Sequence, residues 1–292
     1  MAGFFGFFDY TKPGKGIEKD APEKRPLFLF FELLWMRLGQ LVTLNLIWFV
    51  IILPLLTTLY FFIYVFIFTE LPQTGANVTV QLGVKLSDIA VPFLPGFLLH
   101  MARTIPVVLR YMLLTASIVL YGPASCGMAF MLRNFVQRQH TGTSDFFEKL
   151  KQNFKQGLIL GVMDIFLLGL LFFNILATAG SGYAALDVTR YVSMALLFLY
   201  LTVRHYIYLM AATFELTLGK LLKNALIFSV AGFWRNILVL IVNGAIFFTA
   251  MFLFPAVELL AVPLLLFSLT GFVAMFICYP VIKKYMLDST VS

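Results

Sequence analysis

Long stretches without a charged residue set the strongest limit on what this chain can fold into. The segment from Leu41 to Thr69 carries no charge, and neither do Asn236–Val257 and Leu259–Ile282. About 20 apolar helical residues cross the hydrocarbon of a bilayer, where only helices and closed barrels satisfy the backbone. A barrel would alternate apolar and polar residues in short strands, whereas these runs are continuous. We therefore expect an all-α, polytopic transmembrane helical bundle.

Composition leads to the same class of protein. The 292 residues are 61% hydrophobic and 12% charged, whereas about a quarter of a soluble domain is charged. One core of this size could not bury so much apolar surface. The net charge of +7 lies between the apolar runs, which is typical of loops facing anionic lipid headgroups. We expect a multi-pass protein of the cell membrane with the lipid bilayer as its partner and no nucleic acid.

About six spans are expected in a single membrane domain over residues 1–292. Residues 1–37 form a cytoplasmic lead-in, whose end from Leu27 to Arg37 lies along the interface or leads into the first span. Residues 70–106 form an outer loop, and residues 133–156 and 213–235 form cytoplasmic amphipathic connections. The expected spans are Leu41–Thr69 with a kink at Pro54, Val107–Leu132, Gly157–Gly182, Tyr191–Ala212, Asn236–Val257 and Leu259–Ile282.

The lysines and arginines between the spans predict the orientation. With both termini in the cytoplasm, sixteen of them fall on the inner side and four on the outer side. An excess of basic residues marks the cytoplasmic side of a membrane protein. The sequence therefore predicts a cytoplasmic N-terminus and a cytoplasmic C-terminus.

Several polar residues fall inside the expected spans. Asp164 lies about 10 Å into the third span, and Arg204 and His205 lie about 12 Å from the cytoplasmic end of the fourth. Asn45 and Asn243 fall at similar depths in the first and fifth spans. An unpaired charge there costs about 3 kcal/mol or more, so we predict that Asp164 pairs with Arg204 or with His205. Such a layer is either a substrate or proton site or a buried ion pair that fixes helix register, and we favour the ion pair.

The two cytoplasmic connections carry amphipathic patterns. Asp145 with Glu148 three residues later resembles a capping box with Asp145 as the N-cap. Phe147, Leu150 and Phe154 then fall on one apolar face with lysines around it. One interpretation is anchoring to anionic lipid, and the other is docking of a protein partner. The candidate docking residues are Phe147, Leu150, Lys151, Phe154, Lys220 and Lys223.

Two spans contain small residues at helical spacing, and catalytic signals are scarce. The pairs Gly157 with Gly161 and Gly122 with Cys126 permit close helix approach. The sequence holds no zinc-binding spacing, phosphate-binding loop or nucleophile elbow. We therefore expect no enzymatic activity, no metal and no cofactor.

The chain carries the motifs Phe7–Gly16, Leu44–Trp48 with Pro54, Gly122–Ala124, Leu132–Phe135, Ser144–Phe147, Asn153–Gly157 and Leu221–Ala225. This set, which covers most of the chain, resembles the YesL-like family of uncharacterised Gram-positive integral membrane proteins. Residues 70–106 look like an insertion relative to that family. The sequence around Glu148 does not match the Glu-Ala-Ala loop with a downstream glycine by which an importer permease docks on its ATPase.

The resemblance implies an accessory role beside carbohydrate ABC importers. The leading hypothesis is a non-enzymatic accessory membrane protein that binds the permease subunits of such an importer. The alternative is a stand-alone small-solute transporter that uses the intramembrane polar layer as its site.

Overall fold

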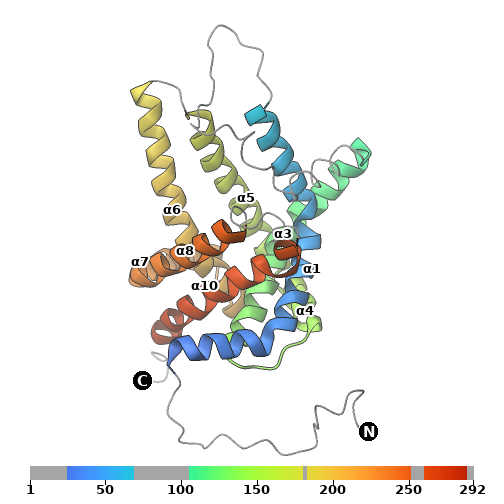
Figure 1. The fold of residues 1–292 in the computed structure, drawn as a ribbon. Coiled ribbons are helices and arrows are strands. Elements are labelled where there is room, and N and C mark those ends of the chain that lie inside the picture. Colours follow the sequence, from blue (N-terminus) through green and yellow to red (C-terminus); the bar gives the residue numbers. More distant parts are fainter. Residues whose placement is uncertain (1–24, 69–104, 180–182, 251–259, 288–292) are drawn as a thin grey trace, which may run out of the picture. The chain divides into compact units, whose positions relative to one another are not determined.

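The computed structural model describes residues 25–68, 105–179, 183–250 and 260–287 (Figure 1). The regular elements in these ranges are all helices, so the predicted all-α bundle is confirmed. The chain divides into two units, Met1–Met36 and Arg37–Ser292. Of the first unit, the structure describes residues 25–36, which include the start of helix α1 (Pro26–Phe68). The predicted outer loop lies outside the described residues from 70 to 104.

Within the described residues, five helical segments are long and apolar enough to cross a membrane. A sixth arises if α7 (Leu218–Ala231) and α8 (Phe233–Phe248), which are bent by 86° to one another, count as one broken span. The five segments are Pro26–Leu59 within α1, α3 (Val107–Val136), α5 (Phe154–Ala177), α6 (Ala184–Thr213), and Val262–Met286, which combines η2 (Val262–Leu266), α10 (Phe267–Ile282) and most of η3 (Lys283–Leu287).

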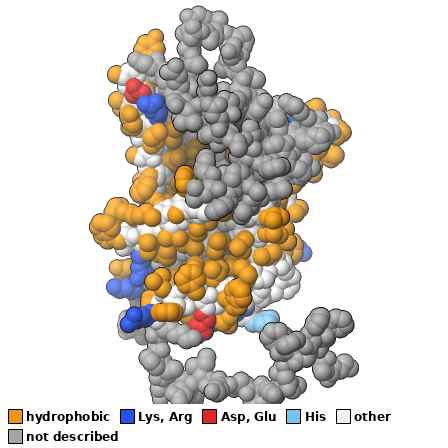
Figure 2. Space-filling model, viewed as in Figure 1, with side chains coloured by type: hydrophobic (Ala, Val, Ile, Leu, Met, Phe, Trp, Pro, Cys, Tyr) orange, Lys and Arg blue, Asp and Glu red, His pale blue; other side chains and the backbone are white. Residues whose placement is uncertain are grey.

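The surface of the described helices is largely apolar. Phe166 on α5 and Trp234 on α8 expose 69% and 80% of their area. Hydrophobic side chains predominate among the described residues on the face shown in Figure 2. Water does not tolerate apolar surface of this extent, but lipid does, so the exposed faces indicate an integral membrane protein.

Helix α3 lies at the centre of the bundle. All residues from Tyr121 to Ala129 are buried, which means that this part of the helix is covered on every side. Helices α5, α6 and α10 pack against it, together with the short helix α4 (Thr143–Gln152). A helix buried all round must be apolar or small all round, and this stretch is built largely from alanine, glycine, serine, cysteine and methionine.

Glycines bring α3 and α5 into backbone contact. A Cβ placed on Gly161 would lie 2.6 Å from the Cα of Gly122, and one on Gly157 would lie 2.8 Å from the Cα of Pro123. Only residues without a side chain permit so close a crossing. The small-residue spacing noted in the sequence therefore marks an intramolecular crossing of these two helices.

The break between α7 and α8 occurs at Gly232 and is held by a buried polar cluster. The amide of Asn236 donates to the carbonyl of Ser229 at 2.7 Å, and the hydroxyl of Tyr206 donates to Asn236 Oδ1 at 3.0 Å. A Cβ on Gly232 would lie 2.5 Å from that hydroxyl. The bend thus requires glycine at position 232, because a side chain there would collide with Tyr206. It also requires Asn236, whose amide donates to the Ser229 carbonyl near the end of α7.

Candidate functional site

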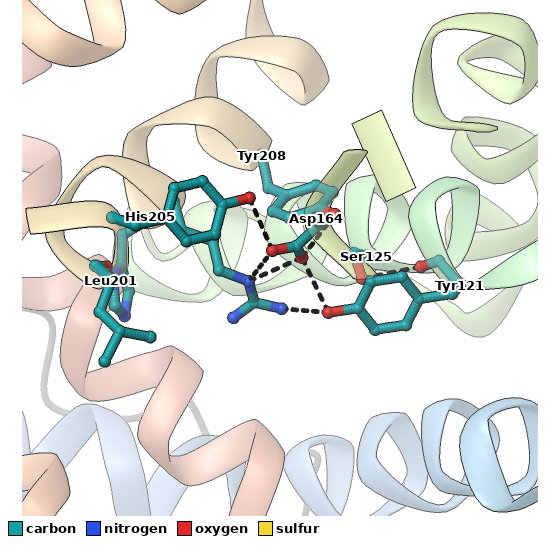
Figure 3. Close-up of polar contacts among 8 residues, drawn as sticks. Tyr121, Ser125, Asp164, Leu201, His205 and Tyr208 are labelled. Atoms are coloured by element: carbon teal, nitrogen blue, oxygen red, sulfur yellow. Dashed lines mark hydrogen bonds and ion pairs between the residues drawn. The ribbon is translucent and has the colours of Figure 1, made fainter. Parts of the chain in front are cut away.

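The predicted pair between Asp164 and Arg204 is present and forms the centre of a polar network (Figure 3). Arg204 Nε donates to both carboxylate oxygens of Asp164, at 2.8 and 3.1 Å. The hydroxyls of three tyrosines also donate to the carboxylate: Tyr121 at 2.8 Å, Tyr200 at 2.8 Å and Tyr208 at 2.9 Å. Arg204 Nη2 in turn donates to the hydroxyl of Tyr121 at 2.5 Å.

Three helices bring the network together. Asp164 lies on α5 one turn beyond Gly161, and Tyr121 lies on α3 next to Gly122, so the glycine crossing sets their separation. Tyr200, Arg204 and Tyr208 follow one another at intervals of four residues and therefore share one face of α6. The network is thus a direct product of helix geometry and one close crossing.

The acceptor positions of the Asp164 carboxylate are filled by protein groups. A carboxylate offers about four lone-pair sites, and this one accepts three hydroxyl groups and one guanidinium that bridges both oxygens. Only 1% of the Asp164 side chain is exposed, whereas 26% of the Arg204 side chain is exposed. A charged acid whose acceptors are filled in this way is typical of a structural ion pair.

Two other residues of the predicted layer are not joined to this carboxylate by the contacts observed. His205 follows Arg204 directly, but its Nδ1 pairs with the backbone carbonyl of Leu201 at 2.6 Å, away from Asp164 (Figure 3). On α8 the amide of Asn243 donates to the carbonyl of Thr270 at 3.1 Å. Within the described residues, Asp164 therefore pairs with Arg204 and not with His205.

Asn45 performs a different task in the structure. Its Nδ2 donates to the carbonyls of Val262 and Pro263, at 2.9 and 2.6 Å, and its Oδ1 accepts the backbone N–H of Ser268 at 2.8 Å. These groups belong to the π-helical segment η2 and the start of α10, where the regular ladder of helical hydrogen bonds is disturbed. Asn45 on α1 thus provides hydrogen-bond partners for backbone groups at the start of the last span.

The sequence assigned the wrong register to helix α4. The helix begins at Thr143 with Gly142 as its N-cap, and the carboxylate of Asp145 at N3 accepts the N–H of Gly142 at 2.9 Å. Asp145 is therefore the N3 residue, whose side chain bonds back to the N-cap backbone, and Glu148 takes no part in the cap. The helix starts three residues earlier than predicted, because Thr143 and Ser144 also fit the first turn of a helix.

The buried face of α4 differs accordingly. Phe146 is fully buried over Gly127 of α3, and Leu150 is 9% exposed, so these two residues hold α4 to the bundle. Phe147 is 46% exposed, and Phe154 begins α5 instead of continuing the face of α4. The prediction that Phe147, Leu150 and Phe154 form one face was wrong, since Phe146 and Leu150 form it.

The remaining docking candidates lie on the surface of adjoining elements. Lys151 on α4 is exposed, and so are Lys220 and Lys223 on α7. The side-chain amide of Gln156 at the start of α5 donates to the carbonyl of Leu216 at 2.8 Å, just before α7. The two predicted cytoplasmic connections are therefore in contact. We call Phe147, Lys151, Lys220 and Lys223 the basic surface.

Sequence reasoning missed the three tyrosines that complete the network. Tyr200 and Tyr208 stand four residues before and after Arg204, and that spacing was a usable signal for hydroxyl partners on the same helix face. Tyr121 carried no comparable signal, because its contact with Asp164 joins residues that are 43 positions apart in the chain.

The described residues contain no group of three or more histidine, cysteine, aspartate or glutamate side chains that could hold a metal ion. His205 is committed to a backbone carbonyl, and Cys126 and Cys278 are buried as free thiols. No protein-family model matches this chain, and neither a curated protein nor a solved structure shows a significant similarity to it.

Proposed function

We propose that this chain is a non-enzymatic accessory protein of the cell membrane that binds the permease subunits of a carbohydrate ABC importer. The motifs that resemble the YesL-like family support the partner class. The observation that supports a binding role most directly is the basic surface, with Phe147 46% exposed on the same helix as the exposed Lys151, and with Lys220 and Lys223 exposed on α7. Exposed aromatic and basic residues on ordered helices are suited to docking on a partner.

The state of Asp164 also favours this proposal over transport by the chain alone. A transport site has to exchange its partners for a substrate or a proton, and it normally borders a water-filled path. Asp164 is buried, and four side chains already occupy its oxygens. Its geometry therefore fits a fixed element of the bundle.

The test is purification of the tagged chain from its native membrane in a mild detergent, followed by mass spectrometry. The proposal predicts stoichiometric recovery of importer permease subunits. Phe147→Ala combined with Lys151→Glu should lower that recovery at least tenfold. Phe166→Ala serves as the matched control, because Phe166 is exposed on α5 and is not part of the basic surface. Recovery of the chain alone, with crosslinking before extraction, would contradict the proposal.

A stand-alone small-solute transporter is the second candidate, and one observation favours it. The Arg204 side chain is 26% exposed although its partner is buried, so an anionic or hydroxylated solute could reach the guanidinium. Flux of solute into liposomes that contain only the purified chain would establish this function. Absence of flux across a panel of sugars, amino acids and organic anions would exclude it for those classes.

A further inference from the structure

A cavity of about 190 Å³ lies between α1, α3 and the start of α4. Its floor is apolar, since Leu44, Met131 and Phe146 line it and are almost completely buried. On α1 it borders Gly39 and Thr43, which are exposed, and a Cβ on Gly39 would meet no atom within 4 Å. The cavity therefore opens to the surroundings along α1.

One residue that lines this cavity carries an unsatisfied hydrogen-bond donor. Thr141 lines it, is only 4% exposed, and has a buried hydroxyl without a hydrogen-bond partner. Such a group costs about 1 to 3 kcal/mol unless something binds it. A neighbouring lining residue, Gln40, accepts a hydrogen bond from Arg37 Nη1 at 2.8 Å. Arg37 does not line the cavity itself, and its Nε is buried without a hydrogen-bond partner.

The charges around the cavity favour an acceptor-rich ligand. Arg37 contributes a guanidinium whose Nη2 donates to the carbonyl of Gln139 at 3.0 Å, while its Nε is left over. The N-terminus of α4 adds partial positive charge at Gly142, although the carboxylate of Asp145 already takes that N–H. The hydroxyl of Thr141 can donate to an oxygen in the cavity, and the guanidinium of Arg37 adds positive charge beside the lining residue Gln40.

We propose that this cavity binds one phospholipid of the surrounding membrane. The phosphate diester would accept a hydrogen bond from Thr141 beside the positive charge of Arg37, and part of an acyl chain would cover the apolar floor at Leu44 and Met131. A free phosphate would leave that floor empty, and a lipid without phosphate would bring no negative charge to Arg37. The inference is independent of importer binding, because the basic surface is not part of the cavity.

Native mass spectrometry of the detergent-purified full chain tests the proposal. The chain should bind one dioleoyl phosphatidylglycerol with at least tenfold higher affinity than dioleoylglycerol, which lacks the phosphate, or sn-glycerol 3-phosphate, which lacks the chains. Thr141→Val removes the hydroxyl at nearly constant shape and should weaken phosphatidylglycerol binding about tenfold, the effect of one hydrogen bond to a charged group.

A second variant tests the cavity by filling it. Gly39→Leu should also lower the affinity about tenfold, whereas Gly169→Leu should leave it unchanged. Gly169 on α5 is the matched control, because a Cβ added there likewise meets no atom within 4 Å and the residue does not line the cavity. Unchanged melting temperatures would show that all variants are folded.

Two outcomes would overturn the proposal. One is that both cavity variants bind phosphatidylglycerol like the wild type. The other is that dioleoylglycerol or glycerol 3-phosphate alone binds as tightly as the complete lipid.

Discussion

Asp164 and Arg204 depend on each other for their place inside the bundle. Each charge would be costly alone in a water-poor interior, and each is neutralised by the other at 2.8 Å. The three tyrosine hydroxyls complete the acceptor positions of the carboxylate, which fixes α3, α5 and α6 in one relative register. At the scale of single residues, the network therefore holds these three helices together.

Neutralising only the acid should destabilise the protein. Asp164→Asn leaves Arg204 without its counter-charge, and we expect a loss of about 3 kcal/mol in the free energy of unfolding. The double variant Asp164→Asn, Arg204→Gln removes both charges and should be more stable than the single variant. Reversible unfolding in mixed micelles measures both values. Additive effects of the two substitutions would show that the residues are not energetically coupled.

Asn45 offers a second test at the scale of one side chain. Asn45→Leu removes all three hydrogen bonds to the η2–α10 junction and leaves the N–H of Ser268 without its acceptor. We expect faster hydrogen exchange at Ser268 and a loss of about 2 kcal/mol in stability, at roughly 0.6 kcal/mol for each bond within a membrane. Leu46→Ala, on the exposed side of α1, is the control, and its exchange at Ser268 should match the wild type.

Among the contacts between helices, the crossing of α3 and α5 determines where the polar network forms. Gly122, Gly157 and Gly161 allow the two backbones to touch, and this contact places Tyr121 beside Asp164. Helix α6 then adds its row of Tyr200, Arg204 and Tyr208 against the same carboxylate. The small residues and the ion pair are thus parts of one arrangement.

A single methyl group at the crossing should disturb both parts. Gly161→Ala places a Cβ 2.6 Å from backbone atoms of Gly122, so the helices must separate, and we expect a loss of about 2 kcal/mol. Gly169→Ala meets no atom within 4 Å and should be neutral or stabilising by up to about 1 kcal/mol. Thermal unfolding in detergent compares the two variants. Equal melting temperatures for both would contradict a tight crossing.

Sequence reasoning succeeded where charge and hydropathy decide the outcome and failed where the packing of particular side chains decides it. Charge-free runs predicted the apolar helices, and the cost of an unpaired charge limited the partner of Asp164 to Arg204 or His205, of which the structure has Arg204. The role of Asn45 was not accessible, because its partners lie 217 to 223 residues further along the chain. The choice between Phe146 and Phe147 was also open to error, because adjacent phenylalanines differ only in which one faces α3.

At the scale of the whole molecule, the distribution of basic residues predicts a cytoplasmic position for the α4 and α7 connections. In a Cys126→Ser, Cys278→Ser background, Lys223→Cys should react with an impermeant thiol reagent only in inside-out vesicles. Tyr183→Cys, at the start of α6, should react in intact cells. Both substituted positions are exposed, so labelling reports sidedness and not burial. The reverse labelling pattern would invert the orientation.

One quantitative co-purification tests most directly whether the basic surface binds the partner while the Asp164–Arg204 network has a structural role. Permease recovery is measured for the wild type, for Asp164→Asn with Arg204→Gln, and for Phe147→Ala with Lys151→Glu, each normalised to the folded, extracted chain. We predict that the charge-neutral interior variant retains most of the partner and that the surface variant loses at least nine-tenths of it. Loss of the partner in the interior variant, with full retention in the surface variant, would contradict the proposal. The polar network around Asp164 would then be the functional site.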